Sequence, residues 1–288
     1  TNKPDIYILM ILNEDVSIEC IYNTIVEKLK IFFKNAGSSR AVLGLSGGID
    51  SAVVMPLACA ALGAENVHGI LMPSQFSTDH SVKDAEDLAK NLGASYDIIP
   101  IKNIYESYLE AMSDYFADGK WSVAQENIQA RVRGAILMTY SNKYNALVLN
   151  TSNKSELSMG YGTLYGDMCG ALMVIADLYK LQVYELARYI NREREIIPLS
   201  TLTKAPSAEL HPGQKDTDSL PKYEVLDPIL YMLNEDKLSA EEIVAKGYDA
   251  QIVTRVSNLK KRSSFKIHQI PPIIKLTENP IVYSEKCI

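Results

Sequence analysis

Residues 45–51, with the sequence LSGGIDS, are of types that together can bind phosphate. They stand between a short apolar run and a stretch of small residues, which is typical of a loop that joins a strand to a helix. Gly47 and Gly48 let backbone N–H groups approach an anion, and the start of the following helix adds partial positive charge. Ser46 and Ser51 supply hydroxyl donors. We therefore predict a phosphate-binding loop at 45–51, called the phosphate loop below.

Two acidic residues could hold a metal ion beside the phosphate loop. Asp50 belongs to the loop, and Glu156 ends the segment 150–156, NTSNKSE, which follows the apolar run 146–149. Because the carboxyl ends of parallel strands meet at one edge of a sheet, both carboxylates should emerge there. Mg²⁺ prefers one or two protein carboxylates together with phosphate oxygens and water. Each acid also suits the first turn of a helix, so the metal hypothesis depends on the pair.

Motifs of several other classes are absent from the sequence. The chain has neither a Gly-x-x-x-x-Gly-Lys-[Ser/Thr] loop for γ-phosphate transfer nor a Gly-x-Gly-x-x-Gly loop for dinucleotides. Its four cysteines, Cys20, Cys59, Cys169 and Cys287, form no Cys-x-x-Cys pair. This pattern argues against a disulfide framework, a zinc site or an iron–sulfur site.

Charge and hydropathy exclude further classes. The formal net charge of −6 and the sequence pI of about 5.4 argue against a nucleic acid partner bound through its phosphate backbone. The longest apolar runs fall far short of the roughly 20 residues of a membrane span. The N-terminal residues lack the basic region, apolar stretch and cleavage site of a secretory signal. We expect a cytoplasmic protein without a membrane partner.

The surrounding elements alternate between strands and helices. Apolar runs predict strands at 40–45, 67–72, 96–99 and 146–149, and helical periodicity predicts helices over 17–35, 51–62, 79–92, 103–116 and 124–143. This alternation predicts an α/β fold, a doubly wound parallel sheet flanked by helices. Pro56 should kink its helix or delay its start. Beyond about residue 195, turns and short helices with a helical segment near 239–262 predict a mostly helical C-terminal extension.

The phosphate loop resembles the pyrophosphate loop of the ATP pyrophosphatases, which cleave ATP between the α and β phosphates. From about residue 20 to residue 272 the chain is similar to the NAD synthetases, in particular to the synthetase domain of the glutamine-dependent enzymes. The blocks that carry this resemblance are 44–51 (GLSGGIDS), 125–133 (QENIQARVR), 150–156 (NTSNKSE), 165–168 (YGDM), 177–180 (DLYK), and 204–210 (KAPSAEL) with 212–221 (PGQKDTDSLP). It divides the chain into an extension or interdomain connector at 1–16, a synthetase domain at 17–272 and a tail at 273–288.

The resemblance implies a ligase that converts nicotinic acid adenine dinucleotide (deamido-NAD), ammonia and ATP into NAD, AMP and pyrophosphate. Ammonia cannot displace an oxygen atom of a carboxylate, because that oxygen is a poor leaving group. The substrate carboxylate must therefore first become an acyl adenylate, from which ammonia then displaces AMP. Such an enzyme holds its reactants in line and stabilises charge on the phosphates, and it needs no covalent nucleophile.

The resemblance also implies roles for individual residues. It places ATP at Gly44, Ser46, Gly47, Gly48, Asp50, Ser51, Thr151, Lys180, Lys204 and Ser207, and Mg²⁺ at Asp50 and Glu156. Asp50, Asp167 and Lys180 would be catalytic, with Asp167 taking a proton from ammonium. The long polar segment 202–221 is expected to be a lid.

Contacts to deamido-NAD are expected from Asn127, Arg131 and Lys266. Asn127 lies four residues before Arg131 and so on the same helix face. For Arg133 we expect an exposed position with a surface salt bridge. The region 265–272 departs from the family pattern, because only Lys266 keeps the charge of a basic cluster that members commonly carry before a proline pair. Leu164 stands where ammonia-dependent members have a lysine.

The partners remain open at this point. Family members are homodimers, so we expect a dimer. Glutamine-dependent enzymes also carry an N-terminal nitrilase-like amidase, which the residues before the phosphate loop cannot form; either free ammonia is the donor or the chain is an excised synthetase domain, and the block 212–221 favours excision. The alternative functions are another ATP pyrophosphatase, such as a GMP synthetase, and a non-catalytic nucleotide-binding protein.

Overall fold

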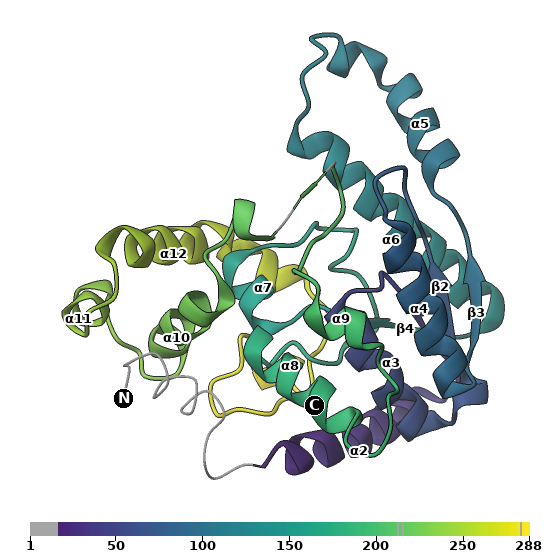
Figure 1. The fold of residues 1–288 in the computed structure, drawn as a ribbon, viewed down its shortest axis with the longest axis horizontal. Helices are drawn as coiled ribbons and strands as arrows, with labels where there is room; N and C mark the ends of the chain where they lie inside the picture. Colours follow the sequence, from purple (N-terminus) through teal and green to yellow (C-terminus); the bar gives the residue numbers. More distant parts are fainter. Residues whose placement is uncertain (1–16, 212, 215, 283) are drawn as a thin grey trace.

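The computed structural model describes residues 17–211, 213–214, 216–282 and 284–288 of the chain. The expected extension or connector at 1–16 lies outside the described residues. Figure 1 shows helices packed around a central sheet, with a group of helices to one side. No helix among the described residues is both long and apolar enough to cross a membrane.

The sheet has five parallel strands in the order β3-β2-β1-β4-β5. Their bounds are β1 Ala41–Gly44, β2 Val67–Leu71, β3 Ser95–Ile98, β4 Leu147–Asn150 and β5 Leu172–Met173. The four predicted strands are confirmed to within two residues. β5 has only two residues and gives no periodic signal, so the sequence did not predict it. The strand order reverses direction between β1 and β4, which is where open α/β sheets bind their ligands.

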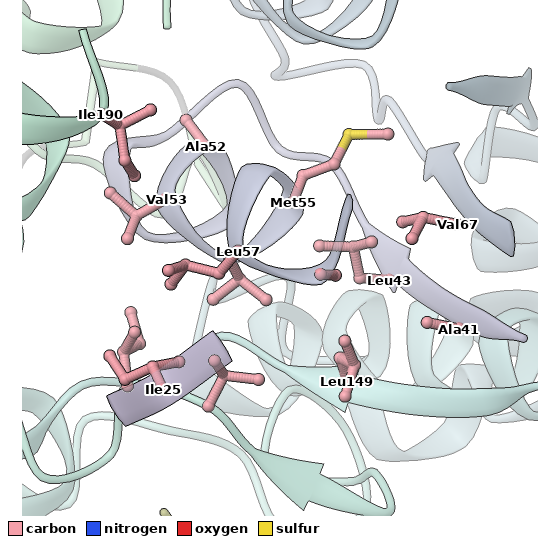
Figure 2. Packing of buried hydrophobic residues seen from close by; sticks show 14 of the residues in the cluster. Ile25, Ala41, Leu43, Ala52, Val53, Met55, Leu57, Val67, Leu149 and Ile190 are labelled. Atoms are coloured by element: carbon pink, nitrogen blue, oxygen red, sulfur yellow. The ribbon is translucent and has the colours of Figure 1, made fainter. Parts of the chain in front are cut away.

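Helices cover both faces of the sheet, as predicted for a doubly wound fold. One face carries α2 (Ile18–Ala36), α3 (Ile49–Leu62), α4 (Asp79–Leu92) and α8 (Lys180–Ile190). The other face carries α5 (Lys102–Ala111) and α6 (Val123–Tyr144). The side chains of β1 are divided between two cores, because Leu43 packs among the first group and Val42 among the second. Figure 2 shows the first core, in which Met55 and Leu57 of α3 lie close to Leu43.

Two helices of the sheet region differ from the prediction. The helix predicted at 51–62 begins at Ile49 and continues through Pro56, so the proline does not delay its start. A proline removes one backbone donor, and here the buried residues around Pro56 keep the helix in place. The helix predicted at 103–116 ends as α5 at Ala111, and a 3-10 turn follows at Ser113–Phe116.

The C-terminal part is mostly helical, as predicted. It comprises α9 (Leu199–Thr203), α10 (Tyr223–Asn234), α11 (Ala240–Ala245) and α12 (Ala250–Ser263), followed by a 3-10 turn at Ser264–Gln269. The segment predicted at 239–262 is two helices, because Gly247 between them has a φ of 99° that no helix contains. The last three helices share an apolar core with α7 (Lys154–Met159).

The last residues, which the sequence divided off as a tail at 273–288, lie against β5. Ile273 and Ile274 are fully buried, and a bridge joins Ile273 to Met173. A buried ion cluster anchors this segment: the Lys154 amine donates to Asp177 at 2.9 Å and to Glu235 at 2.6 Å. Asp177 also accepts the backbone N–H of Leu276. Lys154, which directly precedes Ser155 and Glu156, therefore binds to the end of α10 and to the residue that holds the C-terminal segment.

Candidate active site

A cavity of about 290 Å³ opens at the carboxyl ends of the central strands. It lies beside the reversal of strand order between β1 and β4, where the topology predicts a ligand site. Residues with a predicted role that line it are Gly44, Ser46, Gly48, Asp50, Ser51, Thr151, Glu156, Asp167, Lys180, Lys204 and Ser207. Segments far apart in sequence thus contribute to one cavity.

The phosphate loop joins β1 to the start of α3. The Ser46 hydroxyl accepts the N–H of Gly48 at 3.1 Å, and the Ser51 hydroxyl donates to the carbonyl of Gly48 at 3.1 Å. Gly47 has a φ of 76°, and a Cβ atom there would lie 2.2 Å from the carbonyl oxygen of Ser81 on α4. Only glycine fits this position, because both the backbone angle and the space exclude a side chain.

Lys180 connects the two carboxylates that the sequence singled out. Its amine lies 2.6 Å from Oδ2 of Asp50 and 3.2 Å from Oε1 of Glu156, and only 2% of its side chain is exposed. Asp50 also accepts a hydrogen bond from Nδ2 of Asn153 at 2.9 Å. The pairing of Asp50 and Glu156 at one edge of the sheet is therefore present, with a buried cation between them.

The charges in this group shift one another's pKa values. Burial alone would lower the pKa of Lys180, but the charges of Asp50 and Glu156 outweigh it and raise that pKa. Burial and then the charge of Asp50 raise the pKa of Glu156 to about 8, although Lys180 opposes the shift. Asp216, which is 4% exposed, adds a further carboxylate nearby and also has a raised pKa because it is buried. The carboxyl groups of this cluster thus outnumber its one amine.

The carboxylates of Asp50 and Glu156 fit a Mg²⁺ ion. Both line the cavity, and an added cation would offset the excess charge that raises the pKa of Glu156. The described residues contain no group of three or more His, Cys, Asp or Glu side chains that could hold a metal by themselves. Mg²⁺ commonly takes one or two protein carboxylates and completes its shell with phosphate oxygens and water.

Side chains from two other helices hold the first turn of α8, which carries Lys180. The N–H of Lys180 donates to the Ser155 hydroxyl at 2.9 Å, and the N–H of Leu181 donates to Asp227 at 2.9 Å. Ser155 in turn donates to Asp227 at 2.6 Å. These contacts satisfy N–H groups that a helix start leaves without partners, and both side chains are fully buried. They fix the backbone of Lys180, from which its side chain reaches the two carboxylates.

The expected lid segment begins within α9 and continues as a loop over the cavity. Lys204 to Leu210 line the cavity, and Lys204 forms a salt bridge with Asp84 on α4 at 3.2 Å. The carboxylate of Glu209 accepts from the Ser81 hydroxyl at 2.7 Å and from the Thr78 hydroxyl at 3.1 Å. Lys204 and Glu209 therefore hold this part of the segment against α4.

The three residues expected to contact deamido-NAD converge on one loop, residues 160–164, and do not line the cavity. Asn127 accepts from the Thr163 hydroxyl at 2.7 Å, and Nε of Arg131 donates to the carbonyl of Leu164 at 3.3 Å. The Lys266 amine donates to the carbonyls of residues 160 and 162 at 2.8 and 2.7 Å. Asn127 and Arg131 do share a helix face, and that face meets this loop.

Asp167 lies at the far side of the same loop, on the cavity wall. Its carboxylate accepts the N–H of Thr163 at 2.5 Å. The loss of solvation within the wall raises its pKa, while this hydrogen bond and the charges of Lys266 and Arg133 oppose the shift. A carboxylate with a raised pKa accepts a proton more readily than an ordinary aspartate.

The expectation for Arg133 was wrong. Arg133 is half-buried and lines the cavity, and its Nε donates to the carbonyl of Met72 at the end of β2 at 3.0 Å. The physical reason is helical phase: Gln129 and Val132 of α6 are buried at 0% and 3% exposure, and Arg133 shares their side of the helix. Burial lowers its pKa to about 10, so the guanidinium remains charged at neutral pH.

Comparison with known proteins identifies the family of the chain. Residues 21–270 match the family described as NAD synthase. The chain belongs to the NAD synthase family. Among curated proteins, the glutamine-dependent NAD(+) synthetase of Synechocystis sp. is 50% identical over 263 residues, which cover 91% of this chain and 47% of that protein. The chain thus spans about half the length of the curated relatives it matches.

Solved structures are also similar to the chain over most of its length. An NH3-dependent NAD synthetase from Campylobacter jejuni has 32% identity and a TM-score of 0.72 and is covered over 100% of its length, with 90% of this chain. An NMN synthetase from Francisella tularensis has 30% identity and a TM-score of 0.76, covering 92% of this chain and 98% of that chain.

Replacing Gly47 tests the shape of the phosphate loop. We expect Gly47→Ala to weaken ATP binding at least about tenfold, because the added Cβ must push the loop away from Ser81 and small displacements of a binding site are costly. Isothermal titration calorimetry measures the affinity. Gly37→Ala is the matched control: Gly37 has a φ of 64° but nothing within 4 Å of its Cβ position. Equal ATP affinity in wild type and Gly47→Ala would contradict the assignment of this loop.

Proposed function

We propose that the chain catalyses the ATP-dependent amidation of deamido-NAD to NAD, with AMP and pyrophosphate as the other products. The observation that carries the proposal is the buried Lys180 between Asp50 and Glu156, directly beside a glycine loop at the end of β1. Membership of the NAD synthase family supports the reaction class. The carboxylates and the phosphate loop suit a nucleotide that loses pyrophosphate.

The phosphate loop binds the β and γ phosphates of ATP through backbone N–H groups and the hydroxyls of Ser46 and Ser51. Asp50 and Glu156 would hold Mg²⁺, which supplies positive charge to the phosphates when bound. Lys180 keeps the two carboxylates at a fixed separation, and the lid segment excludes water from the acyl adenylate. Thr151, Lys204 and Ser207 complete the wall around the nucleotide.

The dinucleotide lies along loop 160–164, where Asn127, Arg131 and Lys266 meet. This places its nicotinate carboxylate near Asp167, which faces the cavity. Asp167 takes a proton from the incoming ammonium, and ammonia attacks the carbonyl carbon of the adenylate while AMP leaves with the electron pair of the cleaved C–O bond. The nitrogen then loses a second proton, to the departing AMP phosphate or to water, to give the neutral amide. The raised pKa of Asp167 suits it to this proton transfer.

An assay for NAD formation tests the proposal. We expect product from deamido-NAD, MgATP and ammonium chloride, and a parallel reaction with glutamine in place of ammonium compares the two nitrogen donors. Nicotinic acid mononucleotide serves as a second substrate, since one similar structure is an NMN synthetase. Faster amidation of the mononucleotide would contradict deamido-NAD as the substrate. Pyrophosphate release with a different acceptor, such as xanthosine monophosphate, would favour a GMP synthetase.

Asp167→Asn separates the two chemical steps. We expect the variant to retain exchange of pyrophosphate into ATP and to lose about 100-fold in the rate of amide formation, which is typical of a missing general base. The deficit should shrink as the pH rises, because free ammonia needs no base to remove a proton. A deficit independent of pH, or an equal loss of exchange, would rule out this role for Asp167.

We also propose that the chain forms a homodimer through α5, the turn at 113–116 and the outer face of α6. Large exposed apolar side chains gather there, among them Tyr108 at 49%, Tyr115 at 81% and Met138 at 40% exposure. Figure 1 shows α5 standing away from the body of the molecule. An apolar patch of this kind is typical of a protein interface. A second copy of the chain is the partner we propose for it.

Sedimentation velocity tests the dimer. The wild type should sediment as a dimer, and a Tyr108→Glu, Met112→Glu double variant should sediment as a monomer, because two charges then enter the apolar contact. Ile31→Glu on α2 is the control, since Ile31 is 52% exposed on a different part of the surface. A monomeric wild type under the conditions of full activity would remove the proposal.

A further inference from the structure

Arg133 has no role in the function proposed above, yet it reaches the cavity. Three described cationic side chains line that cavity: Arg133, Lys180 and Lys204. Lys180 is paired with Asp50 and Glu156, and Lys204 is paired with Asp84. Among the residues that the structure describes, Arg133 forms no salt bridge.

The guanidinium of Arg133 is anchored at one nitrogen only. Its Nε donates to the carbonyl of Met72, which fixes the plane of the group at the end of β2. No described group accepts from its two terminal nitrogens, and neither of these nitrogens is a buried atom without a hydrogen-bond partner, so they remain accessible from the cavity. Asp167 and Glu209 favour its positive charge from a distance without pairing with it. An arginine fork held in this way matches the oxygens of a phosphate.

Two parts of the cavity wall indicate where the phosphate bound by Arg133 would lie. The phosphate loop lies at the end of β1, whereas Leu71, Pro73 and Leu137 form an apolar part beside β2 that suits a base. Arg133 lies with the second part, next to Met72. In a nucleotide that spans both parts, the α-phosphate lies between the terminal phosphates and the nucleoside.

We propose that Arg133 binds the α-phosphate of the adenine nucleotide. The inference deepens the proposed function, on which it rests for the identity of the nucleotide. The two terminal nitrogens donate to the nonbridging oxygens of the α-phosphate in ATP, in the acyl adenylate and in AMP. Glu209 of the lid segment lies near this contact, because it accepts hydrogen bonds at the start of α4 and its charge favours that of Arg133.

Calorimetric titration of the full chain with AMP, adenosine and inorganic pyrophosphate tests this contact. We expect Arg133→Gln to weaken AMP binding about tenfold or more, which is typical of losing a charged hydrogen bond. Adenosine and pyrophosphate should bind with unchanged affinity, because neither contains the α-phosphate. Arg133→Lys keeps the positive charge but loses the paired guanidinium donors. Its affinity for AMP should therefore lie between that of the wild type and that of Arg133→Gln.

Lys143→Gln is the matched control, since Lys143 is exposed near the end of the same helix and its loss removes the same charge. Equal weakening of AMP and adenosine in Arg133→Gln would overturn the proposal, as would weaker binding of pyrophosphate alone. If Arg133→Gln does not fold, the comparison of AMP with adenosine in Arg133→Lys decides. These titrations need no turnover, so a wild type that binds AMP but forms no NAD would contradict the proposed function and leave this inference intact.

Discussion

The buried amine of Lys180 is the interaction on which the rest of the site depends. Its distances of 2.6 Å to Asp50 and 3.2 Å to Glu156 join the phosphate loop to α7. Without the lysine, two carboxylates would face each other in a partly buried space, and like charges there are strongly unfavourable. The structure supports the lysine from behind, since Ser155 and Asp227 hold the first turn of α8. Asp227 of α10 thus connects the helical C-terminal part to the position of this amine.

Helix α6, on the other side of the cavity, contributes polar residues to two different surfaces. α6 carries Asn127 and Arg131 on the face that meets loop 160–164 and Arg133 on the face that meets the cavity. One helix therefore divides its polar residues between the proposed dinucleotide surface and the nucleotide cavity. Glu209 and Lys204 of the segment expected to be a lid contact α4 beside the cavity. A nucleotide enclosed in this way would be protected from water, as an acyl adenylate requires.

The sequence predicted four of the five strands because each is a short, largely apolar segment between two helical patterns. It predicted the pairing of Asp50 and Glu156 because both follow strands of one sheet. It did not predict that Lys180, 130 residues from Asp50, would lie between them, because spacing carries no information on such long-range contacts. Arg133 was misplaced because Gln129, which lies one turn before it on α6, is fully buried although its polar side chain gives no sign of this in the sequence. The two residues of β5 were too few for any periodic signal.

The most direct test of the account is the exchange of labelled pyrophosphate into ATP by wild type and by Lys180→Met. The account predicts exchange that requires both deamido-NAD and Mg²⁺ in the wild type. In Lys180→Met, exchange should fall about 100-fold or more, because positioned charges of this kind stabilise the transition state. Circular dichroism and thermal unfolding establish that the variant is folded. Exchange in the folded variant within about twofold of wild type would contradict the central place given to Lys180.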